Sequence, residues 1–216
     1  MFVDYKKIST LFFIAEMSIL YLTRETFNQN ISEIFLKSQL IGDSWNLIKT
    51  PAASRIACEE APLVYLEKCE QKLAEVEDSR EILSFTYHIV FSESFAVPVL
   101  YLNVSRSNGC SLSHDELYSY FKLKKFSEKQ DSVYDLMLTQ QEHPILFKPF
   151  YFVHPCKTAD WMSLIASNLR TEDEAIRKDL DNYTLTWLSS VFSAFKINLD
   201  TKYGLKLSAL KELAGR

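Results

Sequence analysis

Cys156 is the residue of this sequence whose type and surroundings best suit nucleophilic chemistry, within the run FVHPCKT at 152–158. Pro155 ends an apolar segment typical of a strand, and Thr158 is a favourable N-cap for a following helix. We therefore expect Cys156 just ahead of a helix N-terminus, where the helix dipole and the neighbouring Lys157 favour the thiolate. A nucleophilic cysteine needs such an exposed, electropositive turn. A buried and inert cysteine is the alternative, and the pattern alone does not decide between the two.

The remaining cysteines give no sign of a disulfide framework or a metal site. The chain has four cysteines, and Cys58, Cys69 and Cys110 form neither a CxxC motif nor a regular spacing with Cys156. Four cysteines are too few for a disulfide scaffold in a chain of this length and are wrongly spaced for zinc. We therefore predict three inert thiols in a reducing, cytosolic setting, with Cys110 exposed in a turn.

The elements that must position Cys156 begin with a group of strands. Residues 82–92 alternate apolar and polar side chains, which predicts a half-buried strand, and 96–105 predicts a second strand antiparallel to it. Pro98 within the second strand indicates an edge position or a bulge, and Asn108-Gly109 marks the turn that follows. A further short strand is predicted over 149–154, leading directly into the cysteine.

Helices are expected on both sides of these strands in the sequence. Over 26–39 apolar residues recur at helical spacing, and Gly42 supplies a stop. Ser113 opens a Ser-x-x-Glu capping box, and therefore a helix to about residue 122. Two more helices follow the cysteine, over 159–169 and 182–196. The apolar stripe of the last helix consists of Leu185, Leu188, Val191, Phe192 and Phe195.

No linker or repeat divides the chain, so we predict one domain over 26–216 with an N-terminal extension over 1–25. The apolar segment 11–22 is about 12 residues long, short of the roughly 20 that span a bilayer, so stable membrane insertion is not expected. It is interpreted as a helix or a poorly ordered extension, with a signal peptide as the less favoured alternative. Residues 44–80 are hard to interpret: a helix over 62–77, a strand and a mobile loop all remain open.

Composition limits the possible functions. With 47% hydrophobic residues, 15 Phe and 11 Tyr among 216 residues, the chain can bury a substantial core, which indicates a packed α+β domain. Its 4 glycines argue against glycine-rich phosphate loops, and its net charge of −4 argues against nucleic-acid binding. The densest basic run, Lys122, Lys124 and Lys125, is interpreted as a solvated helix end rather than an RNA-binding patch.

The segment LTQQEHPILFKPFYFVHPCKTADWM (138–162) resembles the active-site segment of the autophagy-related protein 10 family, the conjugating enzymes for autophagy-related protein 12. In that family the cysteine of the His-Pro-Cys-Lys-Thr run forms the thioester, and this cysteine corresponds to Cys156. The similarity runs from about residue 26 to about residue 203, whereas residues 46–80 match poorly. Supporting matches occur in SQLIGDSW (38–45), YHIVFSESFAVPVLY (87–101) and YTLTWL (183–188).

The resemblance implies a fold and a reaction. The fold is α+β and ubiquitin-conjugating-enzyme-like, with an antiparallel sheet flanked by helices. The activity is that of a ubiquitin-like protein transferase: Cys156 receives autophagy-related protein 12 from the activating enzyme autophagy-related protein 7. It then passes the modifier to a lysine of autophagy-related protein 5, which supports autophagosome formation. The resemblance also implies a cytoplasmic enzyme without a metal or organic cofactor, whose partners are proteins.

The implied transfer passes through a tetrahedral oxyanion, which needs hydrogen-bond donors. Ordinary ubiquitin-conjugating enzymes have a His-Pro-Asn motif, whereas the comparable run here, 143–145, reads His-Pro-Ile and lacks the amide. Another side chain, or the backbone N–H groups of the helix start, must replace it. Tyr87 and Asn103 are candidates, although a core position for Tyr87 and a solvated loop edge for Asn103 are favoured.

The histidines and one aspartate offer further candidates. His154, two residues before the cysteine, either perturbs the thiol or hydrogen-bonds the backbone, and the second is favoured. His143 is expected to organise the loop before the active-site strand, while His88 and His114 show no partner. Asp160 either helps the attacking lysine to lose its proton or favours the helix dipole, and the dipole interpretation is favoured.

Two other functions remain open. A cysteine protease that deconjugates a ubiquitin-like modifier needs a histidine base held by Asp or Asn, and none of the four histidines carries a recognisable signature. A non-catalytic adaptor of the same fold is the second alternative, although the intact run around Cys156 argues against it.

Overall fold

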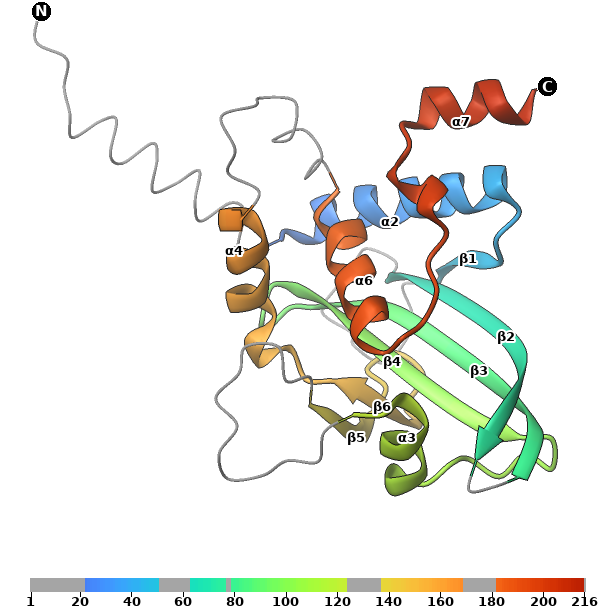
Figure 1. Ribbon diagram of the computed structural model, residues 1–216. Coiled ribbons are helices and arrows are strands. Elements are labelled where there is room, and N and C mark those ends of the chain that lie inside the picture. Colours follow the sequence, from blue (N-terminus) through green and yellow to red (C-terminus); the bar gives the residue numbers. More distant parts are fainter. Residues whose placement is uncertain (1–21, 51–62, 77–78, 124–136, 169–181, 216) are drawn as a thin grey trace, which may run out of the picture.

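The computed structural model in Figure 1 describes residues 22–50, 63–76, 79–123, 137–168 and 182–215. Its strands are β1 (Trp45–Lys49), β2 (Val64–Val76), β3 (Ser79–Ser92), β4 (Val97–Arg106), β5 (Leu138–Glu142) and β6 (Pro149–Val153). Its α-helices are α2 (Arg24–Ile41), α3 (His114–Phe121), α4 (Thr158–Asn168), α6 (Tyr183–Ala194) and α7 (Leu207–Ala214). Its short 3₁₀ helices are η1 (Pro155–Lys157) and η3 (Thr201–Gly204).

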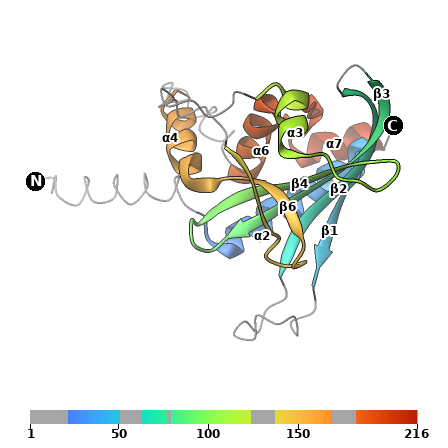
Figure 2. The same ribbon diagram turned by 90° about the horizontal axis from the view of Figure 1, so that it is seen from below.

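The strands of the described residues form one sheet in the order β1-β2-β3-β4-β6-β5. Every neighbouring pair of strands is antiparallel. Figure 2 shows α3, α6 and α7 gathered on the same side of the strands, and α2 packs against β1 and β2. This arrangement confirms the predicted α+β fold, in which an antiparallel sheet is flanked by helices.

The main core lies between the sheet and the helices. Successive side chains of a strand point to opposite faces, so every second residue of β3 enters this core. The buried residues concerned are Leu83, Phe85, Tyr87 and Ile89. The ring of Phe192, from α6, lies in the same core, 5.7 Å from that of Tyr87 in β3 and 6.1 Å from that of Trp45 in β1. The predicted strand and the predicted apolar stripe of α6 are both confirmed.

Side-chain caps determine where the helices begin and end. Thr23 accepts a backbone hydrogen bond at the start of α2, and Gly42 ends that helix with a φ of 73°, a left-handed conformation that favours glycine. The capping box predicted at the start of α3 is present, with Ser113 and Glu116 each bonding the other's backbone amide. Asn182 caps α6 and also donates a 3.0 Å hydrogen bond to a carbonyl of α2.

The turn between β5 and β6 packs against the opposite face of the sheet. A smaller apolar cluster there is formed by Tyr65, Val90, Val99, Tyr101, Ile145, Phe150 and Phe152. β6 pairs with β4 only at Tyr101↔Phe152 and Leu102↔Tyr151, and with β5 along its whole length. Pro98 lies in the part of β4 that pairs with β3 alone, which is the edge position its type indicates.

The helix left open over 62–77 is wrong, because the chain forms the long strand β2 there. The segment is rich in Leu, Glu, Lys, Gln and Ala, all good helix formers. Pairing with β3 from Leu66↔Ile89 to Val76↔Ser79 overrides this preference, since cross-strand packing decides strand formation more than intrinsic propensity does. β1 is a second strand within the segment 44–80.

Some expectations concern residues outside the described ranges: the extension up to residue 21, Cys58, Lys124 and Lys125. Lys122, from the same basic run, is exposed and ends α3 with a φ of 53°, as predicted for a helix end. Within the described part of the chain, no helix combines the length and the apolar character needed to cross a bilayer.

Candidate active site around Cys156

Cys156 lies in η1, between the strand β6 and the helix α4. β6 runs between β4 and β5 and ends at the buried Val153. η1 continues directly into α4 at Thr158, so Cys156 sits on a strand-to-helix turn as predicted. Its side chain is exposed, which excludes the buried alternative. The position therefore offers an accessible thiol on a backbone held at both ends.

His154, rather than Thr158, caps this turn. His154 has an extended backbone, and its Nδ1 accepts a 3.1 Å hydrogen bond from the amide of Cys156. Thr158 is buried and already helical, with φ −63° and ψ −43°, and its amide donates to the carbonyl of Pro155. The predicted N-cap is therefore wrong. Pro155 starts the helical turn earlier, because its φ is preset and it has no amide hydrogen to satisfy.

Two aromatic rings flank the His154 side chain. The ring of Phe152, from β6, lies 5.7 Å away, and that of Phe95, from the turn between β3 and β4, lies 5.9 Å away in a T-shaped arrangement. Because Nδ1 accepts a hydrogen bond, the proton of the neutral imidazole is on Nε2. The backbone role favoured for His154 is confirmed.

The two side chains considered as oxyanion donors belong to the neighbouring strands β3 and β4. Tyr87 is buried in the main core, where burial and then the charge of Glu70 raise the pKa of its phenol. Asn103 accepts a 3.2 Å hydrogen bond from Ser111 Oγ. The core role of Tyr87 is confirmed, whereas the loop edge expected for Asn103 is wrong. Asn103 lies within β4 and pairs with β3, because that strand extends beyond its apolar residues.

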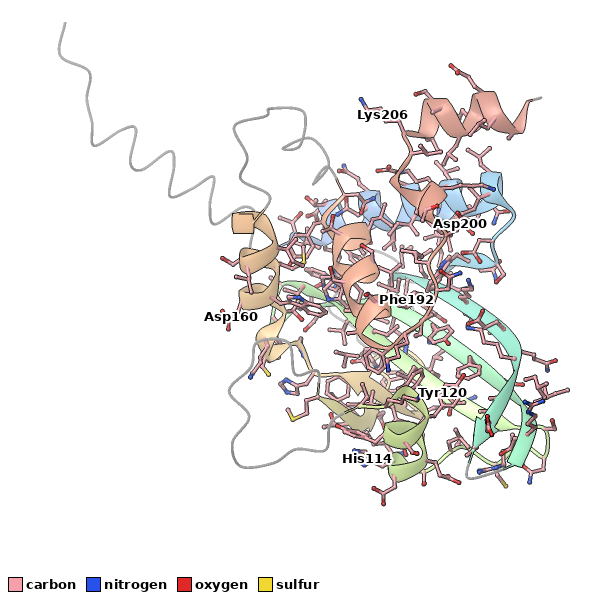
Figure 3. The ribbon with its side chains drawn as sticks, in the orientation of Figure 1. His114, Tyr120, Asp160, Phe192, Asp200 and Lys206 are labelled. Atoms are coloured by element: carbon pink, nitrogen blue, oxygen red, sulfur yellow. The ribbon has the colours of Figure 1, made fainter. Side chains whose placement is uncertain are left out.

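Asp160 lies in the first turn of α4, on the outer side of the helix in Figure 3, and its side chain is exposed. This place suits the helix dipole, as favoured from the sequence. Its part in deprotonating an attacking lysine stays a prediction. Lys157, next to the cysteine in η1, is half-buried.

A buried chain of two histidines, on the opposite face of the sheet from the main core, was not predicted. His88 Nδ1 lies 3.1 Å from His143 Nε2, and His88 Nε2 lies 3.0 Å from Glu67 Oε2. His143 Nδ1 accepts from the amides of Ile145 and Leu146, which confirms its role in the loop. His143 therefore donates to His88, and His88 donates to Glu67. The expectation that His88 lacks a partner is wrong, because its partners are distant in the sequence and no local pattern marks them.

Both buried histidines are neutral at neutral pH. Burial, and then the neighbouring His88, lowers the pKa of His143 to about 3. Burial also lowers the pKa of His88, against the opposing effect of Glu67. His114 likewise has a partner that the sequence did not indicate, since its Nε2 lies 3.2 Å from the carbonyl of Leu138.

Cys156 is exposed at the surface and does not line the groove described here. A groove of about 800 Å³ opens between the β2–β3 hairpin and the ends of α3 and α6, and its lining includes Phe85, Tyr120 and Phe195 but not Cys156. Across the described ranges, no group of three or more His, Cys, Asp or Glu side chains is placed to hold a metal ion. An exposed thiol of this kind suits a protein substrate better than a small molecule.

Comparison with known proteins places these observations in a family. The family described as "Autophagocytosis associated protein, active-site domain" matches residues 22–201. A Homo sapiens protein named ubiquitin-like-conjugating enzyme ATG10 is 28% identical over 215 residues, which cover 85% of this chain and 92% of that protein. Proteins of the same name from Dictyostelium discoideum and Arabidopsis thaliana are 38% identical over 114 residues and 32% identical over 107 residues. These two matches cover 51% and 50% of this chain and 49% and 46% of those proteins.

The similarities confirm the resemblance seen at 138–162 and extend it over most of the chain. The predicted class, a ubiquitin-like protein transferase of autophagy, is confirmed by the names of the three relatives. The matched region contains the whole sheet together with η1 and α4, the elements that hold Cys156. The chain belongs to the autophagocytosis-associated protein family that includes the ubiquitin-like-conjugating enzymes ATG10.

Proposed function

We propose that this protein is the conjugating enzyme that carries autophagy-related protein 12 as a thioester on Cys156. The activating enzyme autophagy-related protein 7 supplies the modifier, and a lysine of autophagy-related protein 5 receives it, in support of autophagosome formation. The observation that carries this proposal is the exposed thiol of Cys156, on a turn between β6 and α4. The turn lies within the residues that match the family's active-site domain.

Two acyl transfers make up the proposed reaction. In the first, the Cys156 thiolate attacks the carbonyl carbon of the modifier's C-terminal glycine, and the new C–S bond replaces the thioester bond to the activating enzyme, whose thiolate leaves. In the second, a neutral lysine amine attacks the same carbon. An isopeptide C–N bond forms, the Cys156 thiolate leaves, and the amine proton passes to solvent. Neither transfer changes an oxidation state, so neither needs a redox partner.

The turn restricts which groups can stabilise the oxyanions of these transfers. The amide of Cys156 donates to His154, and the amide of Thr158 donates to the carbonyl of Pro155. Tyr87 is enclosed in the core. We therefore expect the donor to be another backbone amide of η1 or of the first turn of α4, another side chain near η1, or a group that a partner protein supplies.

A deconjugating protease fits this site less well. It needs a histidine base beside the thiol, and all four histidines lie in the described ranges. His154 bonds the backbone of Cys156 rather than its sulfur. The other three accept or donate elsewhere: His88 with His143, and His114 with a carbonyl of β5. The experiment below also distinguishes a non-catalytic adaptor from a conjugating enzyme and from a protease.

Mixing the protein with activating enzyme, modifier and ATP, and comparing gels with and without thiol, tests the proposal. The wild type is expected to form an adduct that thiol cleaves, whereas Cys156→Ser should form none or a thiol-resistant oxyester. Cys110→Ser is the matched control, because Cys110 is also an exposed free thiol, and it should keep full adduct formation. A thiol-sensitive adduct on Cys156→Ser would contradict the assignment. Release of free modifier without an amine acceptor would indicate a protease, and no adduct on the wild type would indicate an adaptor.

The proposal also includes the domain boundaries of the chain and the cellular compartment of the protein. We propose a conjugating domain over residues 26–216, preceded by an extension over 1–25 whose last residues, from Arg24 on, belong to α2. A free catalytic thiol persists best in a reducing compartment, so we place the protein in the cytoplasm.

A further inference from the structure

The hydrogen bond from Cys156 to His154 joins an imidazole to the backbone of the proposed nucleophile. His154 Nδ1 lies 3.1 Å from the Cys156 nitrogen, and the backbone of His154 is extended, with φ −62° and ψ 127°. Pro155 has no amide hydrogen, so the amide of Cys156 is the first donor of the turn that needs an acceptor. His154 thus acts at η1 as Ser, Asn or Asp act at ordinary helix starts.

The imidazole is held from two sides. Phe152 is buried in β6, and Phe95 covers the ring from the turn between β3 and β4. Phe95 is 42% exposed, so burial of its own ring gives little reason for this position. Contact with the ring of His154 therefore explains the position of the Phe95 ring better than burial does.

The turn that presents Phe95 is itself anchored. Ala96 has a left-handed φ of 50°, a conformation that is unfavourable for a residue with a Cβ. Its carbonyl accepts a 2.7 Å hydrogen bond from the amide of Leu22, and Arg24 forms a 2.5 Å ion pair with Glu93. The start of α2 therefore holds the turn, and with it the aromatic ring, against the imidazole.

We propose that His154 is a positioning residue for the reaction at Cys156, with Phe95 keeping its imidazole in the required rotamer. This inference rests on the proposed function of Cys156. His154 orients the peptide between Pro155 and Cys156, and thereby the direction in which the sulfur leaves the turn. Orientation matters because a misplacement of about 1 Å can lower a rate about 100-fold. The role requires a neutral ring, since an imidazolium has no acceptor nitrogen.

Two substitutions separate positioning from a direct catalytic role. His154→Ala removes the acceptor, whereas His154→Asn retains one, because an asparagine oxygen accepts a nearby amide at a helix start. We expect single-turnover thioester formation to fall about 10- to 100-fold in His154→Ala and to stay within about threefold of wild type in His154→Asn. Ser113→Ala is the matched control, because it removes the N-cap of a different helix, α3, and it should leave the rate unchanged.

A second measurement does not depend on the partner proteins. The rate at which iodoacetamide alkylates Cys156 is followed by mass spectrometry, with the exposed Cys110 as the internal reference. The ratio of the two rates should change in His154→Ala and in Phe95→Ala, and should return to the wild-type value in His154→Asn. Near-ultraviolet circular dichroism of each variant verifies that the fold is retained.

Equal thioester rates for the wild type and a folded His154→Ala variant would overturn the inference. Failure of His154→Asn to recover activity would overturn it too, because the imidazole itself would then be required at the substrate. If alkylation responds as expected but not even the wild type forms a thioester, the proposed function fails while the positioning of the thiol by His154 stands.

Discussion

At the scale of single residues, His143 shows how a buried side chain acts on the site from a distance. Its Nδ1 holds two amides of the turn between β5 and β6, at 3.2 Å and 3.1 Å, while its Nε2 faces His88. Through Glu67 the same chain of hydrogen bonds reaches β2. The turn that leads into β6, and from there to Cys156, is thus bonded to the centre of the sheet.

Acid is expected to destabilise the protein through His143. Its pKa in the folded protein is about 3, below the value of about 6.5 for an unfolded histidine, so the unfolded state binds more protons between these two values. The contribution of His143 to the free energy of unfolding is therefore fully present above about pH 6.5 and is lost as the pH falls toward 3. Between about pH 7.5 and pH 5 we expect this residue to lower the free energy of unfolding by about 2 kcal/mol. Urea unfolding across this range measures the loss.

His143→Asn is the comparison for this experiment, because asparagine keeps an acceptor for the turn but does not titrate in this range. Its free energy of unfolding should fall less steeply with acid than that of the wild type, by about the same 2 kcal/mol. Parallel curves for the two proteins would show that His143 does not carry the pH dependence.

At the scale of elements, α6 joins the sheet to α2. Its first turn is capped by Asn182, which also bonds a carbonyl of α2. Its last turn carries Phe192, labelled in Figure 3, whose ring contacts Trp45 of β1 and Tyr87 of β3. One helix therefore packs on two strands that are not neighbours in the sheet. Removing a side chain from this contact is expected to weaken packing on both strands.

Phe192→Ala is expected to lower the free energy of unfolding by about 3 to 5 kcal/mol, because the ring is buried and its removal leaves a cavity. Leu213→Ala is the control, since Leu213 also lies on a helix but is 55% exposed, and its effect should stay within about 0.5 kcal/mol. Denaturant unfolding of both variants provides the comparison. A cost below about 1 kcal/mol for Phe192→Ala would mean that the core repacks around the missing ring.

At the scale of the whole molecule, the C-terminal segment closes against the first described helix. Tyr203 of η3 is buried, its hydroxyl donates to Asp43 at 2.8 Å, and its carbonyl accepts from Lys37 of α2 at 3.0 Å. Leu210 of α7 is buried as well, and Figure 1 shows α7 beside α2. The family match ends at residue 201, so Tyr203 and Leu210 lie beyond the matched region while Lys37 and Asp43 lie within it.

A chain that ends at residue 200 is expected to be less stable by several kcal/mol, because burying a large apolar side chain contributes about 1.5 to 3 kcal/mol and both Tyr203 and Leu210 are lost. A chain that ends at residue 213 is the control, since it lacks only exposed or undescribed residues. Thermal unfolding of the two truncated proteins and the full chain measures the difference. Equal unfolding midpoints would show that the C-terminal segment adds no stability.

The sequence by itself determined those features that depend on residues a few positions apart. Alternation over 82–92 specifies β3, because side chains of a strand change face at each residue. The capping box at Ser113 and the stop at Gly42 are equally local. The place of Cys156 on a turn also follows locally, from an apolar run that Pro155 ends. These features could be predicted because their physical causes lie within one or two turns of chain.

Where the local sequence allowed more than one structure, contacts between distant residues decided the outcome, and only the tertiary structure shows those contacts. Residues 64–76 have helix-forming composition and become β2 because β3 pairs with them. His88 and His143 are 55 positions apart and meet only because the sheet and the turn before β6 bring them together. Apart from that of proline, helix propensities differ by no more than about 1 kcal/mol per residue. A whole strand adds the contributions of many cross-strand side-chain pairs. Where the local preference is weak, the long-range contacts determine the structure.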